Sequence, residues 1–169
     1  MAVHSAGIML YRWSTTGQPE VWIAHMGGPF WARKDARGWS IPKGEFPEDE
    51  DPLTAALREF AEEMGAPAPD ADYRELGTFR QPSGKIITAF AAEADFQPDQ
   101  ILSNTFPLEW PKGSGVIQDF PEIDHAAWFP ETDARVKLVK GQLPILDALL
   151  RVLGESGGRK GRPVDPPAL

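Results

Sequence analysis

The chain has 169 residues, 41% of them hydrophobic and 25% charged, and it contains no cysteine. This is the composition of an ordinary globular protein, and it excludes disulfides, thiolate metal sites, iron–sulfur clusters and a cysteine nucleophile. The net charge of −8 argues against a protein that binds nucleic acid through a broad basic face. A chain of this length predicts one domain with a core of its own.

The N-terminal sequence predicts neither secretion nor membrane insertion. Residues 1–12 have no basic leader before their apolar stretch and no cleavage site, so we expect no signal peptide. No uncharged run reaches the roughly 18 apolar residues that a membrane helix needs. Because a cysteine-free chain also suits a reducing compartment, we expect a cytoplasmic protein.

The first third of the chain predicts a hairpin followed by a loop. Strands are expected at 3–12 and 20–26, separated by a turn at 15–19. Gly27 and Gly28 end the second strand, and residues 30–38 form a loop that is rich in aromatic and basic side chains. A short strand is expected at 39–41.

The next element is a helix with well-marked ends. Asp51 suits the N-cap and Pro52 the first helical position, where its missing N–H costs nothing. Gly65 suits a left-handed C-cap, and Pro67 prevents continuation. The sequence therefore predicts a helix over residues 52–64.

The remaining elements are strands followed by helices. We expect strands at 73–80, 85–96, 105–110 and 126–129, a loop at 111–115, and helices at 131–140 and from Pro144 onward. Strands and helices do not alternate regularly, so the sequence predicts an α+β fold, an α/β/α sandwich with a mixed β-sheet. Residues 1–153 form the predicted single domain, and the Gly- and Pro-rich residues 154–169 are expected to be a disordered tail.

The predicted helix carries three carboxylates on one face. At about 100° per residue, Glu59, Glu62 and Glu63 lie side by side, away from an apolar stripe formed by Leu53, Ala56, Leu57, Phe60 and Met64. Such like-charge neighbours cost about 0.2–0.5 kcal/mol per pair. A divalent cation would relieve this repulsion, and clustered carboxylates suit Mg²⁺ or Mn²⁺. From the helix alone, a solvated acidic face is an equally good interpretation.

The wider spacing distinguishes these interpretations. Gly44, Glu50, Arg58 and Gly65 stand with the three glutamates at spacings that resemble the Nudix box, the signature of the Nudix hydrolase family. The one departure is Ala66, where the family usually has a bulkier aliphatic residue. The resemblance extends more loosely over residues 3–153, and the whole chain most resembles a bacterial branch of predicted nucleotide pyrophosphohydrolases.

The resemblance implies an activity and a ligand set. Nudix hydrolases cleave a nucleoside diphosphate that is linked to another group, using a divalent metal and water. By this resemblance, Glu59, Glu62 and Glu63 bind Mg²⁺ or Mn²⁺ with help from a backbone carbonyl near Gly44. Glu50 and Arg58 match positions that orient and neutralise these carboxylates. The metal also explains how an acidic protein binds an anionic substrate.

The resemblance leaves the general base and the substrate contacts open. Glu59 and Glu122 are the two candidate bases, and Glu109 is a weaker one; Glu122 could equally be a further ligand or an exposed loop acid. The expected phosphate contact is Lys43, with Arg33, Lys34 and Lys85 as further candidates. Trp31 is a candidate for stacking on a base. Trp39 is at least as easily explained as a core residue.

The substrate class is the least determined feature. The segment 39–44, Trp-Ser-Ile-Pro-Lys-Gly, resembles the opening of dinucleoside polyphosphate hydrolases. However, the tyrosine that this branch often carries after the box is absent, and Pro82 is not at the position typical of ADP-ribose hydrolases. We therefore expect a nucleoside triphosphate or dinucleoside polyphosphate as substrate. The alternatives are an inactive Nudix-fold nucleotide-binding or regulatory domain and an RNA-decapping enzyme, which would need a basic region that this chain lacks.

Overall fold

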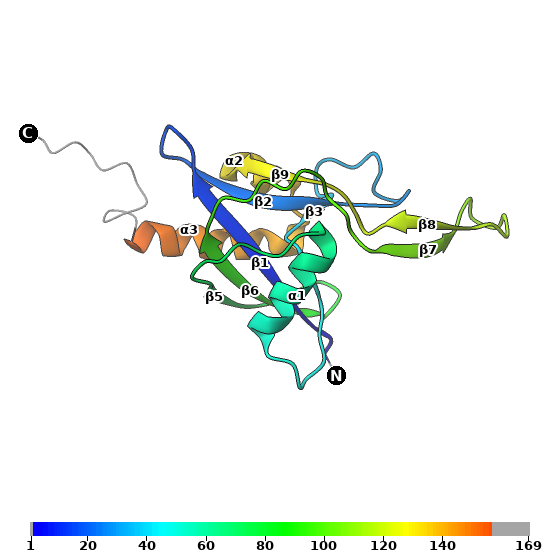
Figure 1. The fold of residues 1–169 in the computed structure, drawn as a ribbon, viewed down its shortest axis with the longest axis horizontal. Helices are drawn as coiled ribbons and strands as arrows, with labels where there is room; N and C mark the ends of the chain where they lie inside the picture. The colour runs from blue at the N-terminus through cyan, green and yellow to red at the C-terminus, as the bar shows by residue number, and fades with distance from the viewer. Residues whose placement is uncertain (1, 157–169) are drawn as a thin grey trace, which may run out of the picture.

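Two helical layers enclose a mixed β-sheet in the computed structural model, which describes residues 2–156 (Figure 1). The strands are β1 (His4–Trp13), β2 (Pro19–Met26), β3 (Trp39–Ser40), β4 (Lys43–Glu45), β5 (Arg74–Arg80), β6 (Ile86–Glu93), β7 (Thr105–Glu109), β8 (Ile117–Pro121) and β9 (Ile123–Pro130). The helices are α1 (Pro52–Met64), α2 (Glu131–Lys137) and α3 (Leu143–Ser156), with a 3₁₀ turn at Lys140–Gln142. The predicted α+β class and mixed sheet are confirmed. None of the helices in this part of the chain is long and apolar enough to cross a membrane.

The sheet topology creates an opening beside β1. The strand order is β3-β2-β1-β6-β5, with β9 paired to β2 and only the β1–β6 pair parallel among the pairs of this sheet. Because β6 occupies one edge of β1 along its length, β2 and β4 must share the other edge. β2 pairs at the far end, where Tyr11 faces Val21, and β4 pairs at the start, where Gly7 faces Lys43. β2 therefore diverges from β1 near the start of β1, and β4 fits into the gap between them. This brings Gly44 next to α1.

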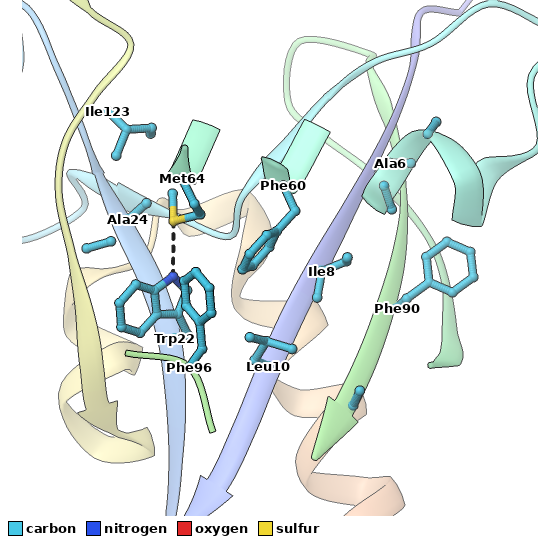
Figure 2. Packing of buried hydrophobic residues seen from close by; sticks show 14 residues of the cluster. Ala6, Ile8, Leu10, Trp22, Ala24, Phe60, Met64, Phe90, Phe96 and Ile123 are labelled. Carbon is cyan, nitrogen blue, oxygen red and sulfur yellow. Dashed lines mark hydrogen bonds between the residues drawn. The ribbon is translucent and has the colours of Figure 1, made fainter. Parts of the chain in front are cut away.

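Apolar clusters on the two faces of the sheet hold the helices in place. On one face, Phe60 and Met64 of α1 pack with Ile8, Trp22 and Phe96. Figure 2 shows both α1 side chains directed into this cluster, with the Trp22 indole Nε1–H donating to the Met64 sulfur at 3.2 Å. The other face packs against α2 and α3 through residues such as Ile23, Ile145 and Leu149. The α/β/α layering follows from these two clusters.

Replacement of Phe60 by alanine is expected to destabilise the protein strongly. Its side chain is fully buried and its ring lies 5.0 Å from that of Phe96, so truncation leaves a cavity that rigid neighbours cannot fill. Such substitutions cost about 3–5 kcal/mol. Denaturant unfolding measures this loss, and Leu57→Ala, at a half-buried position of the same helix, should cost less. A loss below about 1 kcal/mol for Phe60→Ala would contradict this account of the core.

The predicted helix bounds are confirmed for α1. Asp51 Oδ2 accepts a hydrogen bond from the Thr54 backbone N–H at 3.0 Å, and Pro52 occupies the first turn. Gly65 ends the helix with φ 77°, a left-handed conformation that favours glycine. Local capping chemistry therefore sets the position of the glutamates.

The loop predicted at 111–115 is the turn between two strands, but the residues after it form a strand that was not predicted. After a turn, β8 pairs with β7 in a separate two-stranded sheet, where Phe106 faces Phe120, and this hairpin projects from one end of the molecule (Figure 1). Glu122 is the single residue between β8 and β9. It therefore lies at a fixed joint between two strands and not on a long loop. β4 was not predicted either, because its three residues form a strand only by pairing with β1.

The C-terminal helices differ from prediction at their ends. α2 stops at Lys137, because Leu138 is buried in an extended conformation and forms a bridge with Trp39. α3 continues to Ser156, three residues into the predicted tail. The rest of that predicted tail, 157–169, lies outside the described residues.

Candidate active site

Helix α1 directs two of its three clustered glutamates against β4. The Glu63 carboxylate accepts a hydrogen bond from the Lys43 backbone N–H at 3.1 Å. The Glu59 side chain, 15% exposed, lies against Gly44 so closely that any side chain at position 44 would overlap its carboxylate. Glu62, 39% exposed, lies farther out. Gly44 is therefore required for the approach of Glu59 to the backbone.

Arg58 links the acidic residues to one another. Its Nε and Nη2 donate to both oxygens of Glu50, at 3.0 and 2.9 Å. Its Nη1 donates to Glu59 at 2.6 Å and to Glu62 at 3.3 Å. Hydrogen bonding to Arg58 lowers the pKa of Glu50 below its ordinary value. The guanidinium therefore joins three carboxylates, and the orienting and neutralising roles of Glu50 and Arg58 remain predictions.

Burial dominates the electrostatics of the inner pair. It raises the pKa of Glu63 to about 8, opposed by the hydrogen bond from Lys43, with the nearby charges of Glu122 and Glu59 adding to the rise. Burial also lowers the pKa of the Lys43 ammonium and raises that of Glu59. A positive charge at this position would restore the ionised form of Glu63.

Glu122 belongs to the same site although it is distant in sequence. Its negative charge contributes to the raised pKa of Glu63, so the two carboxylates lie within electrostatic range of each other. Its backbone N–H donates to the Asn104 carbonyl at 2.9 Å, and its carbonyl accepts from the Gly27 N–H at 2.8 Å. The side chain is exposed. The structure thus brings together Glu122 and the acidic face of α1.

The donor set of this site suits a hard divalent cation. Residues 2–156 contain no group of three or more His, Cys, Asp or Glu side chains arranged to hold a metal ion. Arg58 and the Lys43 N–H are hydrogen-bonded to the carboxylate oxygens of the site. The available ligands are nevertheless all oxygens, and Gly44 leaves Glu59 room against the backbone. These features fit Mg²⁺ or Mn²⁺, which favour carboxylate and carbonyl oxygens.

The loop that is predicted to bind substrate lines a cavity separate from the acidic face of α1. Arg33 and Lys34 are exposed and line a cavity of about 370 Å³ together with His25, Trp39, Asp124 and His125. The Lys34 ammonium lies 5.2 Å from the centre of the Trp31 ring. Asp124 connects this cavity to the site, since it lies two residues after Glu122.

Three other candidates have different surroundings. Lys85 forms an ion pair with Glu45 at 2.8 Å, and its charge lowers the pKa of Lys43. Trp39 is a core residue, and its Nε1–H donates to Asp35 at 3.1 Å. Glu109, the weaker candidate base, accepts a hydrogen bond from the Gly115 N–H at 2.8 Å within the β7–β8 turn.

Sequence reasoning missed the residues that hold Glu122 in place. The His25 imidazole and the Asp124 carboxylate form a hydrogen bond across 99 positions of the chain, and the Gly27 N–H donates to the Glu122 carbonyl. No local motif marks such contacts; the only available signal was an aspartate near the strand at 126–129.

The comparisons with known proteins concern the family and the fold of this chain. A family model described as NUDIX domain matches residues 4–149. A search among curated proteins found no significant match. Among solved structures, a C. elegans Ap4A hydrolase is 19% identical with a TM-score of 0.63, covering 89% of this chain and 98% of that one. The NUDIX domain of Shewanella oneidensis NrtR, complexed with ADP ribose, is 19% identical with a TM-score of 0.64, covering 90% and 89%. A Nudix hydrolase from M. smegmatis, RenU, is 21% identical with a TM-score of 0.56, covering 90% and 86%.

At these identities the solved structures agree in fold alone. The family match, in contrast, covers most of the chain and includes the whole acidic helix. The chain belongs to the Nudix family, and this membership places it in the class of nucleotide pyrophosphohydrolases.

Proposed function

We propose that the protein is a Mg²⁺- or Mn²⁺-dependent hydrolase that cleaves the diphosphate linkage of a nucleoside triphosphate or dinucleoside polyphosphate. The observation that carries this proposal is the complete set of Glu59, Glu62 and Glu63 on one helix, with Arg58 bonded to the first two and the Lys43 N–H bonded to Glu63. A chain that only bound nucleotides would need no such set of mutually repelling carboxylates. We place this activity in the cytoplasm, since the chain has no cysteine.

In this proposal the chain's own residues bind, orient and accept a proton. Glu59, Glu62 and Glu63 would hold the cation, which when bound polarises a phosphoryl oxygen and lowers the pKa of water. A water oxygen forms a bond to phosphorus, and the bond from phosphorus to the leaving phosphate oxygen breaks. Glu122, or Glu59 in its place, accepts the proton of the attacking water. Lys43 would contact the phosphates.

The proposed substrate class rests on motif and fold together. The segment 39–44 resembles the opening of dinucleoside polyphosphate hydrolases, and a C. elegans Ap4A hydrolase shares the fold. The NrtR domain that was solved with ADP ribose adds a second ligand class to examine. In the loop 30–38, Trp31 would stack on a base while Arg33 and Lys34 contact phosphate. Lys85 would contribute only if its ion pair with Glu45 opened.

A substrate panel tests this function. ATP, an oxidised nucleoside triphosphate, Ap4A, ADP-ribose and NADH are incubated with the protein in Mg²⁺, in Mn²⁺ or in excess chelator, and the products are identified. We expect turnover of at least one triphosphate or dinucleoside polyphosphate with metal alone. Tight nucleotide binding without turnover would instead indicate a Nudix-fold binding domain. Hydrolysis in excess chelator would contradict the metal-dependent mechanism.

Gly44→Ala is expected to lower activity while leaving the fold intact. The added methyl group would overlap the Glu59 carboxylate and displace it, and misplacement of a catalytic group by about 1 Å can cost a hundredfold in rate. Steady-state kinetics and the unfolding temperature measure the two effects. Gly154→Ala is the matched control, because a methyl group there meets open space on α3. Unchanged turnover in Gly44→Ala would contradict the proposed role of Glu59.

A further inference from the structure

Strand β9 contains a β-bulge at Asp124. His25 of β2 pairs with His125, but the next residue, Met26, pairs with Ile123, so Asp124 has no partner across the ladder. A bulge of this kind inserts one residue into one strand and redirects the side chains beyond it. Here the redirected residues are Ile123 and Glu122.

The bulge determines which side chain enters the core. Ala126 faces the cluster under α1, and strict alternation would place Asp124 on that same face. Because of the bulge, Ile123 packs there instead, at 5% exposure. A register without the bulge would bury the Asp124 carboxylate among apolar residues, so the bulge sets the direction of the chain at Glu122.

His25 secures this bulge from the neighbouring strand. The side chain is 11% exposed, and its Nδ1 lies 2.8 Å from Asp124 Oδ1. Its Nε2 lies 2.7 Å from the Lys34 carbonyl oxygen, and its ring packs edge to face on Trp39 with centroids 5.2 Å apart. A single imidazole therefore ties the bulge to the loop that carries Arg33 and Lys34.

The backbone on the other side of Glu122 is held equally closely. The Gly27 N–H donates to the Glu122 carbonyl at 2.8 Å, and any side chain on Gly27 would overlap the Pro121 carbonyl. Gly27 lies two residues after His25 on the same stretch of chain. The contacts of His25 and Gly27 together fix residues 121–124 against β2.

We propose that the His25–Asp124 pair is a positioning device that fixes the bulge of β9 and thereby directs the Glu122 carboxylate toward Glu63. The catalytic consequence of this inference rests on the proposed function. Partly exposed polar pairs add little to the free energy of unfolding, and the Asp124 side chain is 37% exposed. The pair therefore acts on local geometry more than on global stability.

The test compares Asp124→Ala with Asp124→Asn and with a control, Asp119→Ala, at an exposed position of β8. Asparagine retains an oxygen that can accept from His25, whereas alanine removes it. Kinetics on the preferred nucleotide give kcat and KM separately. Hydrogen exchange of the Gly27 amide, measured by NMR on the metal-free protein, reports the contact with Glu122 without any need for activity.

We expect Asp124→Ala to lower kcat by about 10–100-fold, as for residues that orient a catalytic group, with little change in KM. Asp124→Asn should recover most of that loss, and Asp119→Ala should behave as wild type. The Gly27 amide should exchange faster in Asp124→Ala alone. Added to Glu122→Gln, Asp124→Ala should lower kcat no further, because the two residues act as a unit.

Two results would overturn the proposal. One is an unchanged Gly27 exchange rate in Asp124→Ala; the other is a loss of kcat that multiplies with that of Glu122→Gln. If the wild-type protein hydrolyses no nucleotide in the panel, the proposed function fails, but the Gly27 exchange rate still decides whether Asp124 fixes the backbone at Glu122.

Discussion

Glu63→Gln should remove almost all turnover from the protein and leave its fold intact. The lost carboxylate is the most buried of the three on α1, with its pKa raised to about 8 by burial. A bound cation would restore its charge, and the neutral carbonyl oxygen of glutamine would be a weaker ligand than this carboxylate. Stabilisation of transition-state charge by a metal is worth several kcal/mol, and each ~1.4 kcal/mol changes the rate about tenfold. A loss of at least about a hundredfold in kcat follows.

The same substitution is expected to leave stability unchanged or raised. Glutamine has nearly the shape of glutamate, and its carbonyl oxygen can still accept from the Lys43 N–H. Because burial raises the pKa of Glu63 to about 8, this side chain is mostly protonated at neutral pH without metal, so the neutral amide adds no new buried charge. Thermal unfolding in chelator measures this, and Glu75→Gln, at an exposed position of β5, is the matched control. Wild-type turnover in Glu63→Gln would contradict the role of this residue as a metal ligand.

The position of α1 could be predicted because every signal for it is local. Asp51, Pro52 and Gly65 fix its two ends through capping contacts within a few residues. The apolar stripe and the glutamate stripe then follow from helical geometry alone. The family resemblance supplied the roles of these residues, and the structure adds the contacts of Arg58 that join Glu50, Glu59 and Glu62.

The surroundings of Glu122 could not be predicted because they depend on pairing between distant segments. β8 is a strand only because it pairs with β7. β4 can pair with β1 because Gly7, which has no side chain, leaves room for the Lys43 side chain. The bulge at Asp124 depends on His25, which is 99 positions away. Hydrophobic periodicity reports neither strand register nor bulges. The same limit applies to Lys85, whose ion pair with Glu45 spans 40 positions.

Glu122→Gln is expected to lower kcat by about 10²–10⁴-fold if its carboxylate is the general base, the usual cost of losing one. This exposed carboxylate lies within electrostatic range of Glu63, on a backbone held by hydrogen bonds to Gly27 and Asn104. Because the side chain is exposed, its replacement should change the free energy of unfolding by no more than about 0.5 kcal/mol. The unfolding temperature should then shift by about 2 °C at most.

Steady-state kinetics across a range of pH give the clearest measurement. Loss of the base should remove the acidic limb of the kcat profile in Glu122→Gln, whereas a purely structural effect would lower the whole profile. Glu109→Gln is the matched control, since this carboxylate lies on the hairpin that precedes Glu122 but accepts from the Gly115 N–H in the turn, a contact that glutamine can keep. An effect of Glu122→Gln below about threefold would assign the proton transfer to Glu59 or another acid, because general-base loss costs far more.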